Sequence, residues 1–194
     1  MIGVIIANDI FYTPYVWSYV NKLEELNYQY EVIMWDRHYK EGKKYPIEIK
    51  HILKLNSNET KNKILKIKDY LIFRKFLIKV LKENNYTKLI FLSTFTAIFL
   101  PKIIFEKFKG NYIFDFRDAT YEYLPFFLNK EKFIIKNAYC TTISSYGFKE
   151  ILPQTDFLLT HNMNFQNINF YRNPKHLNDK IVLHFYVHLE ILII

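Results

Sequence analysis

The sequence has one cysteine, four glycines and only four arginines in 194 residues. Because Cys140 has no second cysteine to pair with, an intrachain disulfide is excluded, and a reducing cytoplasm is the expected compartment. The glycines are isolated from one another, so the chain contains neither the GxGxxG pattern of dinucleotide-binding domains nor a P-loop. These absences argue against classical NAD-type and P-loop nucleotide chemistry.

Long hydrophobic runs are also missing. The longest, residues 89–100, is interrupted by Ser93, Thr94 and Thr96, and it is shorter than the roughly 20 apolar residues that span a bilayer. The amino terminus lacks the basic region and the cleavage site of a signal peptide. The six histidines form no HExxH motif, and no GxSxG elbow occurs, so we expect neither a metal site nor a serine hydrolase.

The net charge of +8 is carried by lysine rather than arginine. A basic balance is typical of proteins that bind nucleic acids or anionic membranes. Specific recognition of phosphates and bases relies on arginine forks, which are scarce here. The abundant residues Lys, Ile, Asn, Tyr and Phe also share AT-rich codons, so part of the charge reflects base composition. We therefore expect no specific nucleic-acid partner.

Short apolar runs alternate with helical patterns along most of the chain. The runs typical of strands are residues 2–7, 30–35, 47–53, 88–92, 111–116, 139–143 and 157–160. The helical patterns cover residues 14–26, capped by Thr13, and 60–83, 94–108, 121–137 and a short stretch that follows Ser145 and stops at Pro153. The repeating strand and helix order predicts an α/β fold, namely a Rossmann-like, doubly wound, mainly parallel sheet with helices on both faces.

The composition changes near the carboxyl-terminal end. Half of the residues are hydrophobic, which is enough for one well-buried domain, and we place it at residues 1–162. Residues 163–180 are rich in asparagine and polar, as in a linker. Residues 181–194 open with KIVL, which suits the first strand of a second domain, so we interpret them as the remnant of a truncated or frame-shifted domain.

Three charged residues stand where the strand NYIFDF ends, namely Asp115, Arg117 and Asp118. The carboxyl ends of parallel strands face the ligand crevice in open α/β sheets, so these charges are candidates for a site. The structural alternative is that Arg117 pairs with a neighbouring carboxylate and Asp118 caps the next helix. Both interpretations can hold, because an ion pair at a strand end can also shape the floor of a polar pocket.

Two further polar groups follow predicted strands. Asn8 and Asp9, with the rings of Phe11 and Tyr12, follow the first strand and could hold a sugar, or they form an ordinary surface loop. Ser144 and Ser145 follow the strand at residues 139–143. They are expected to cap a helix, although such a helix start also favours a phosphate or a sugar hydroxyl.

Together these segments resemble the amino-terminal half of bacterial GT-B glycosyltransferases, particularly the group-4-like enzymes that assemble capsules and surface polysaccharides. The resemblance rests on the first strand with Asn8 and Asp9, on YIFDFRD, on TTISSYGFKEILP and on FLLTHN, and it spans residues 1–162. It implies two Rossmann-like domains, with the acceptor on this domain and the nucleotide-sugar on the other.

The resemblance also implies a hexosyltransferase-like activity that needs no cofactor beyond the nucleotide-sugar donor. Catalytic residues stay unassigned, and the fragment is expected to be inactive without its donor domain. The residues that would face the acceptor side of the cleft are Asn8, Asp9, Phe11, Tyr12, Ser93, Thr94, Asp115, Arg117, Asp118, Ser144, Ser145 and Asn162. The alternative is a non-enzymatic, flavodoxin-like or receiver-like binding module.

The predicted helix at residues 60–83 is strongly basic. A basic helix can lie on an anionic bilayer, and surface-glycan transferases must reach a glycan or a lipid-linked glycan acceptor at the cytoplasmic leaflet. The lysines predicted to face the membrane are Lys61, Lys63, Lys66 and Lys68. The alternative is a solvated lysine face on a helix that packs against the sheet. The expected location is cytoplasmic, with peripheral attachment to the inner face of the plasma membrane.

Overall fold

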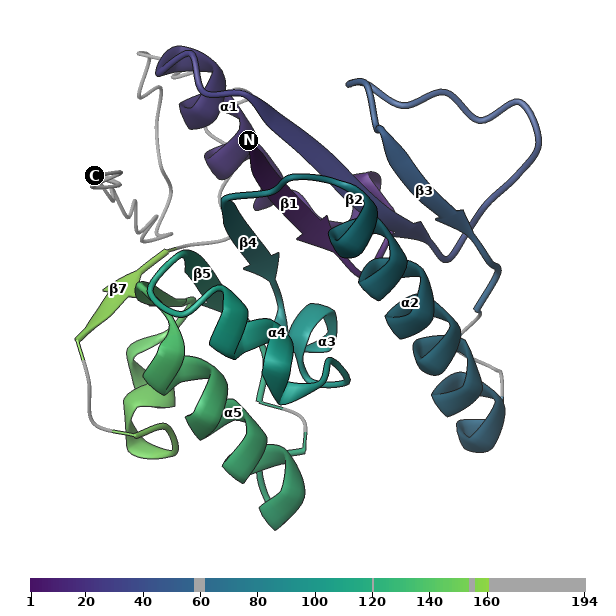
Figure 1. The fold of residues 1–194 in the computed structure, drawn as a ribbon. Coiled ribbons are helices and arrows are strands. Elements are labelled where there is room, and N and C mark those ends of the chain that lie inside the picture. The colour runs from purple at the N-terminus through teal and green to yellow at the C-terminus, as the bar shows by residue number, and fades with distance from the viewer. Residues whose placement is uncertain (58–61, 120, 154–155, 161–194) are drawn as a thin grey trace, which may run out of the picture.

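The computed structural model describes residues 1–57, 62–119, 121–153 and 156–160. Within them the strands form one seven-stranded sheet in the order β3-β2-β1-β4-β5-β6-β7, and every neighbouring pair is parallel (Figure 1). The predicted α/β, Rossmann-like class is therefore confirmed. Asn162, the predicted linker and the predicted remnant of a second domain lie outside the described residues.

The strands are short, as is usual for a parallel sheet. They are β1 (Ile2–Ile6), β2 (Tyr30–Asp36), β3 (His51–Lys54), β4 (Lys88–Leu92), β5 (Tyr112–Phe116), β6 (Cys140–Ile143) and β7 (Phe157–Leu159). The α-helices are α1 (Val16–Glu25), α2 (Lys63–Glu83), α3 (Thr94–Ala97), α4 (Lys102–Lys107) and α5 (Pro125–Asn137). Two 3₁₀ turns, η1 (Ile10–Tyr12) and η2 (Tyr146–Glu150), follow β1 and β6.

The first strand of the sequence lies in the interior of the sheet, between β2 and β4. Ile5 of β1 pairs with Ile33 of β2 on one side and with Phe91 of β4 on the other. The chain therefore builds β2 and β3 outward from β1 and then returns across β1 to start β4. This reversal creates a topological switch point between β1 and β4, and ligands of open α/β sheets bind at the carboxyl ends of the strands at such a point.

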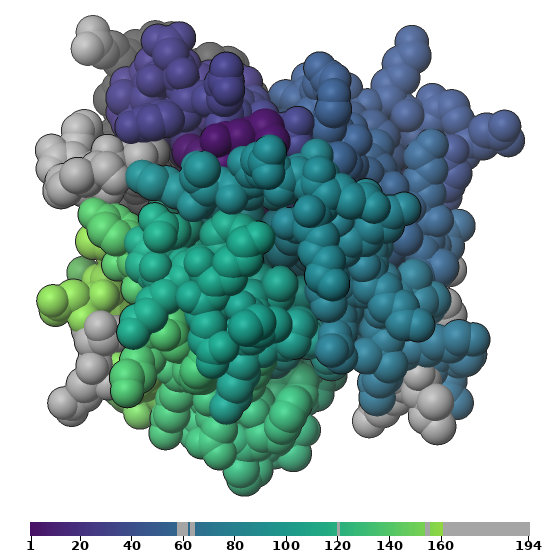
Figure 2. Space-filling model, in the orientation of Figure 1, coloured from purple at the N-terminus to yellow at the C-terminus, as the bar shows by residue number. Residues whose placement is uncertain are grey.

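Helices pack on both faces of β1. Val4 belongs to the same buried cluster as Val20 of α1, whereas Ile5 belongs to a second cluster that includes Leu77 of α2 and Ile134 of α5. Because successive strand residues point to opposite faces, α1 covers one face and α2 and α5 cover the other. In the space-filling view the purple of the first residues is only a narrow band between the segments around it (Figure 2).

Several boundaries differ from those that the sequence predicts. The helix predicted at residues 94–108 is two helices, α3 and α4, because Pro101 has no amide proton to donate and precedes the second helix with an extended backbone. The helix predicted from residue 121 begins at Pro125. Thr13 does not cap α1, since its hydroxyl donates to the Asp9 carbonyl at 3.0 Å, and α1 begins at Val16 without a side-chain cap.

Among the described residues, no helix is both long enough and apolar enough to cross a bilayer.

Candidate functional site

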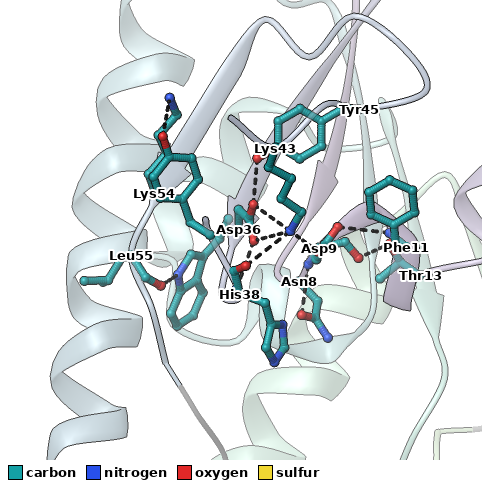
Figure 3. Close-up of polar contacts among 12 residues, drawn as sticks. Asn8, Asp9, Phe11, Thr13, Asp36, His38, Lys43, Tyr45, Lys54 and Leu55 are labelled. Carbon is teal, nitrogen blue, oxygen red and sulfur yellow. Dashed lines mark hydrogen bonds and ion pairs between the residues drawn. The ribbon is translucent and has the colours of Figure 1, made fainter. Parts of the chain in front are cut away.

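Lys43 lies between two carboxylates at the carboxyl ends of β1 and β2 (Figure 3). Its ammonium group is 3.0 and 2.9 Å from the two carboxyl oxygens of Asp36, and it also contacts Oδ2 of Asp9. A weaker hydrogen bond, at 3.4 Å, runs from the same nitrogen to the His38 carbonyl. We refer to Asp9, Asp36 and Lys43 as the carboxylate clamp.

Local backbone structure fixes the two carboxylates of the clamp. Asp9 begins η1, and its Oδ1 accepts a hydrogen bond from the Phe11 amide at 3.0 Å. Asp36 is the last residue of β2, and its Oδ1 accepts from the His38 amide at 2.9 Å. The Tyr45 hydroxyl donates to Asp36 Oδ2 at 2.6 Å. Each carboxylate is therefore held by hydrogen bonds from its own strand end as well as by the lysine.

Asp36 and Lys43 stay charged at neutral pH. Burial alone would raise the pKa of Asp36, but hydrogen bonds from Tyr45, Lys43 and the His38 amide outweigh it and hold this pKa below its usual value. Burial likewise opposes the charge of Lys43, and the two carboxylates overcome it and raise its pKa. Two negative charges and one positive charge leave the clamp with a net charge of about −1.

An open cleft of about 510 Å³ lies beside the clamp. Its walls come from the loop after β1 and the loop after β2, and they consist of Asp9, Phe11, Tyr12, His38, Lys40, Glu41, Gly42 and Lys43. The rings of Phe11 and Tyr12 are 59% and 62% exposed, and the Tyr12 ring lies 4.8 Å from the His38 ring. Aromatic walls next to charged and hydrogen-bonding groups suit a ligand that has both apolar faces and polar edges.

A second polar group, around Asp115, lies inside the sheet. Arg117 donates to Asp115 Oδ2 from Nε at 2.8 Å and from Nη2 at 2.6 Å, and its Nη1 donates to the Thr160 carbonyl at 3.2 Å. The Thr142 hydroxyl donates to Asp115 Oδ1 at 2.7 Å. Both members of the ion pair are buried. The pair thus joins β5 to β6 and to the residue after β7, and it braces the carboxyl edge.

Helix α1 covers this ion pair with two tyrosines. The Tyr19 hydroxyl is 3.0 Å from Thr142 Oγ1, and the Arg117 guanidinium lies 4.5 Å from the centre of the Tyr15 ring. Burial raises the pKa of the Tyr15 hydroxyl to about 12, and the nearby Asp115 carboxylate adds to the shift. The Asp115 carboxylate also raises the pKa of Arg117 against the effect of burial. Burial raises the pKa of Asp115 itself, and Arg117 together with the hydrogen bonds from Thr142 and Tyr19 opposes that rise. Tyr15 therefore stays neutral and Arg117 stays charged at neutral pH.

The other residues predicted for the cleft are dispersed along the same edge. Asp118 is exposed and does not cap α5, whose first turn follows Leu124. Ser144 donates to the Arg117 carbonyl at 2.9 Å, and Ser145 caps η2 by accepting from the Gly147 amide at 3.3 Å. Ser145 thus has the predicted capping role, whereas Ser144 does not cap η2 and instead links the start of this segment to the end of β5.

The residues at the end of β4 lie at the switch point. Ser93 has a φ of 79°, a left-handed conformation that is rare outside glycine, and Thr94 begins α3 with its hydroxyl buried. Asn8 is half-buried, and its Oδ1 accepts from the Asp9 amide at 2.9 Å. The structure therefore brings Asp9, Phe11 and Tyr12 together, whereas Ser93, Thr94, Asp118, Ser144 and Ser145 contribute to other parts of the edge.

Sequence reasoning missed four residues that shape the site, namely Asp36, His38, Lys43 and Tyr45. Asp36 carried a usable signal, because it ends the strand that neighbours β1 and therefore had to lie near Asp9. Lys43 and Tyr45 lie in the loop between β2 and β3, which has no periodic pattern that fixes where its side chains point.

The described residues contain no group of three His, Cys, Asp or Glu side chains suited to hold a metal ion. A smaller hollow, of about 110 Å³, lies at the opposite edge of the sheet among the first residues of β1, β4 and β5, including Ile2, Lys88 and Tyr112. It is apolar and distant from the carboxyl ends, so the cleft beside the clamp remains the better candidate.

Comparison of this chain with protein-family models, with curated proteins and with solved structures finds no match. The site is therefore interpreted from its own geometry.

Proposed function

We propose that residues 1–160 form the acceptor-binding domain of a glycosyltransferase that moves a sugar from a nucleotide-sugar to a surface-polysaccharide acceptor. The observation that carries this proposal is the open cleft at the carboxyl edge, where the carboxylate clamp lies beside the exposed rings of Phe11 and Tyr12. The resemblance of the chain to GT-B enzymes provides the reaction class. The nucleotide-sugar itself would be held by a donor domain.

The chemistry of the cleft suits a sugar. Pyranose rings have apolar C–H faces that pack on aromatic rings, and their hydroxyls donate to carboxylates and accept from ammonium and imidazole groups. Phe11 and Tyr12 offer the rings, and the partly exposed Lys43 offers its ammonium group. In the reaction an acceptor hydroxyl would attack the anomeric carbon of the donor, release the nucleoside diphosphate and lose its proton.

The test is direct binding of acceptor sugars to this chain. Saturation-transfer NMR with monosaccharides and oligosaccharide fragments of surface glycans should detect contacts to the sugar ring protons, and Phe11→Ala and Tyr12→Ala should each weaken binding about tenfold. Tyr139→Ala is the matched control, because this ring is also half-exposed but lies at the start of β6, away from the clamp. The proposal fails if no sugar binds, or if the control weakens binding as much as the two cleft variants.

We further propose that α2 places this domain on an anionic membrane, at the inner face of the plasma membrane. The supporting observation is one exposed face of α2 on which Ile67 and Leu71, 53% and 41% exposed, stand beside Lys68 and Lys75. Such a face combines apolar contact with attraction to acidic headgroups, about 1 kcal/mol per lysine near the surface. Of the other predicted lysines, Lys66 is half-buried, Lys61 lies outside the described residues, and the side chain of Lys63 is not described.

Co-sedimentation with anionic liposomes tests the membrane proposal. Binding should weaken with salt, and it should weaken when Lys68 and Lys75 are changed together to glutamine. The paired change Lys107→Gln and Lys109→Gln, on exposed lysines near the end of α4, is the matched control. If the chain stays in the supernatant with anionic vesicles at low salt, α2 serves only to pack against the sheet.

A further inference from the structure

Glu131 is a fully buried carboxyl in the middle of α5. Its relative exposure is 0%, and neither carboxyl oxygen makes a hydrogen bond to a described residue. Burying an ionised carboxylate without a partner carries a large free-energy penalty, so such a group either finds a counter-charge or takes up a proton. No counter-charge is present on the described elements that pack around it.

Two groups face Glu131, and neither is positive. They are the carboxyl of Glu122, from the segment between β5 and α5, and the hydroxyl of Thr94, from the first turn of α3. Thr94 is itself buried, at 6% exposure, and its hydroxyl has no hydrogen-bond partner among the described residues. Three polar groups from three different segments therefore meet here, of which Glu131 and Thr94 are buried and Glu122 is half-buried.

Two lysines flank Glu131 in the sequence: Lys132 is exposed, and Lys130 points elsewhere. The Lys130 ammonium lies 5.1 Å from the centre of the Phe105 ring and 5.8 Å from that of Phe133. The charges that act on it are those of Lys102, Arg74 and Glu106. Lys130 therefore leaves the negative charge of Glu131 uncompensated.

This environment favours the protonated acid. Burial raises the pKa of Glu131 to about 8, and the like charge of Glu122 adds to the shift. At neutral pH the Glu131 carboxyl consequently carries its proton and acts as a hydrogen-bond donor. A hydrogen bond from this proton to the Glu122 carboxyl would satisfy a group that otherwise has no partner among the described residues.

The segment that carries Glu122 also covers α3 with aromatic rings. Tyr121 lies 6.1 Å from Phe95 and 5.1 Å from Phe127, and Phe127 lies 6.3 Å from Phe99 (ring centre to ring centre). We call residues 121–127 the aromatic strap. It leads from Asp118 at the carboxyl edge of the sheet to the first turn of α5.

We propose that Glu131 shares its proton with Glu122, and that this proton holds the aromatic strap against α3. Loss of the proton to solvent would leave two carboxylates facing each other without a counter-charge, and their repulsion and hydration would release the strap. The strap would then be docked on α3 at neutral pH and released in alkaline solution. This inference does not depend on the proposed glycosyltransferase function.

Hydrogen exchange measured by mass spectrometry on the strap peptide tests the proposal. Wild type and Glu131→Gln are compared at the same pH, so that intrinsic exchange rates cancel. At about pH 6 the two should exchange alike, and at about pH 9.5 the wild-type strap should exchange about fivefold or more faster, because only the wild type can lose the proton. Glu150→Gln, the same change at an exposed glutamate of η2, should behave as wild type. Equal protection of wild type and Glu131→Gln at both pH values would overturn the proposal.

Stability gives an independent measurement. Glu131 has an unfolded pKa of about 4.3 and a higher pKa in the folded protein. Between these two values the native state binds one more proton than the unfolded state. The free energy of unfolding must therefore fall as pH rises through this window and level off above it. Relative to Glu131→Gln, the unfolding constant of the wild type should rise about tenfold per pH unit between about pH 5.5 and pH 7.5. A flat difference would overturn the proposal.

Glu122→Gln separates proton sharing from simple burial. It removes the like charge and keeps the side-chain shape, so the pH midpoint for strap release should move to lower pH. An unchanged midpoint would show that Glu122 takes no part. A final experiment adds calcium or magnesium at about pH 9.5 and measures hydrogen exchange of the strap. Slower exchange with either ion would mean that the two carboxyls bind a cation rather than share a proton, and this result would also overturn the proposal.

Discussion

Asp9 and Asp36 end neighbouring parallel strands and face the same ammonium group, that of Lys43. Neither carboxylate has more than 2% of its side chain exposed, while the lysine retains 16%. The two strand ends would repel each other without this cation. The loop between β2 and β3 is therefore tied to the sheet by electrostatic attraction as well as by packing.

Replacing Lys43 with methionine should destabilise the protein by roughly 2–4 kcal/mol, toward the lower end of the range for breaking a buried ion pair, since the lysine is partly exposed. The loss arises because two buried carboxylates remain unpaired. Urea denaturation monitored by circular dichroism measures it. Lys44→Met, at the exposed neighbouring lysine, is the control and should stay within about 0.5 kcal/mol of wild type. A loss below about 1 kcal/mol for Lys43→Met would contradict a structural role for the clamp.

The clamp should also make the free energy of unfolding depend on pH in acidic solution. The pKa of Asp36 is lowered in the folded state, so its contribution is fully present above the unfolded aspartate pKa of about 3.9 and is lost as pH falls through the folded value. Wild type should therefore be more stable than Asp36→Asn at about pH 6, and the difference should shrink steadily below about pH 4.5. Urea unfolding at a series of pH values tests this, and a difference that does not change with pH would refute it.

The Arg117 and Asp115 pair should behave as one unit. Arg117→Leu should cost about 3–5 kcal/mol because it leaves Asp115 charged and buried, and the double variant Arg117→Leu with Asp115→Leu should recover a large part of that loss. Denaturant unfolding of the two single variants and the double variant completes a thermodynamic cycle. Additive losses would mean that the two side chains contribute independently.

Replacing Ser93 with glycine should increase the stability of the folded protein. Its φ of 79° lies in a region that L residues avoid, at a strain of about 1–3 kcal/mol, and glycine removes that strain while adding about 0.5–1 kcal/mol of unfolded-state entropy. We expect Ser93→Gly to raise stability by up to about 1 kcal/mol, measured as a shift in the urea midpoint. Ser93→Ala keeps the strain and should not stabilise. Stabilisation by alanine instead would assign the effect to the side chain.

The sheet was predictable because buried parallel strands are nearly continuous apolar runs. Ile2–Ile6 and Lys88–Leu92 show this pattern plainly, and their neighbours follow from the strand and helix order. Helix starts were harder to predict. Thr13 and Pro14 form a good capping sequence, but Thr13 is used to close the turn that begins at Asp9, and the helix begins two residues after Pro14.

The candidate site was predictable only in part. Asp115 and Arg117 stand two residues apart, so their side chains share one face of the chain, and their pairing could be anticipated as the structural alternative. The partnership of Asp9 with Asp36 needed the strand order. The place of Lys43 depends on how an irregular loop folds back over the sheet, which no local pattern specifies.

The lengths of the outermost strands bear on how this protein avoids associating with itself. Among the described residues the sheet is bordered by β3 with four residues and β7 with three, while β2 in its interior has seven. An edge strand exposes unpaired amide and carbonyl groups that can template pairing with another chain, and a short edge offers few of them. Lys54, exposed at the end of β3, places a charge on that border. Both borders therefore offer few groups for edge-to-edge pairing between molecules, and at β3 the charge of Lys54 adds to this protection against aggregation.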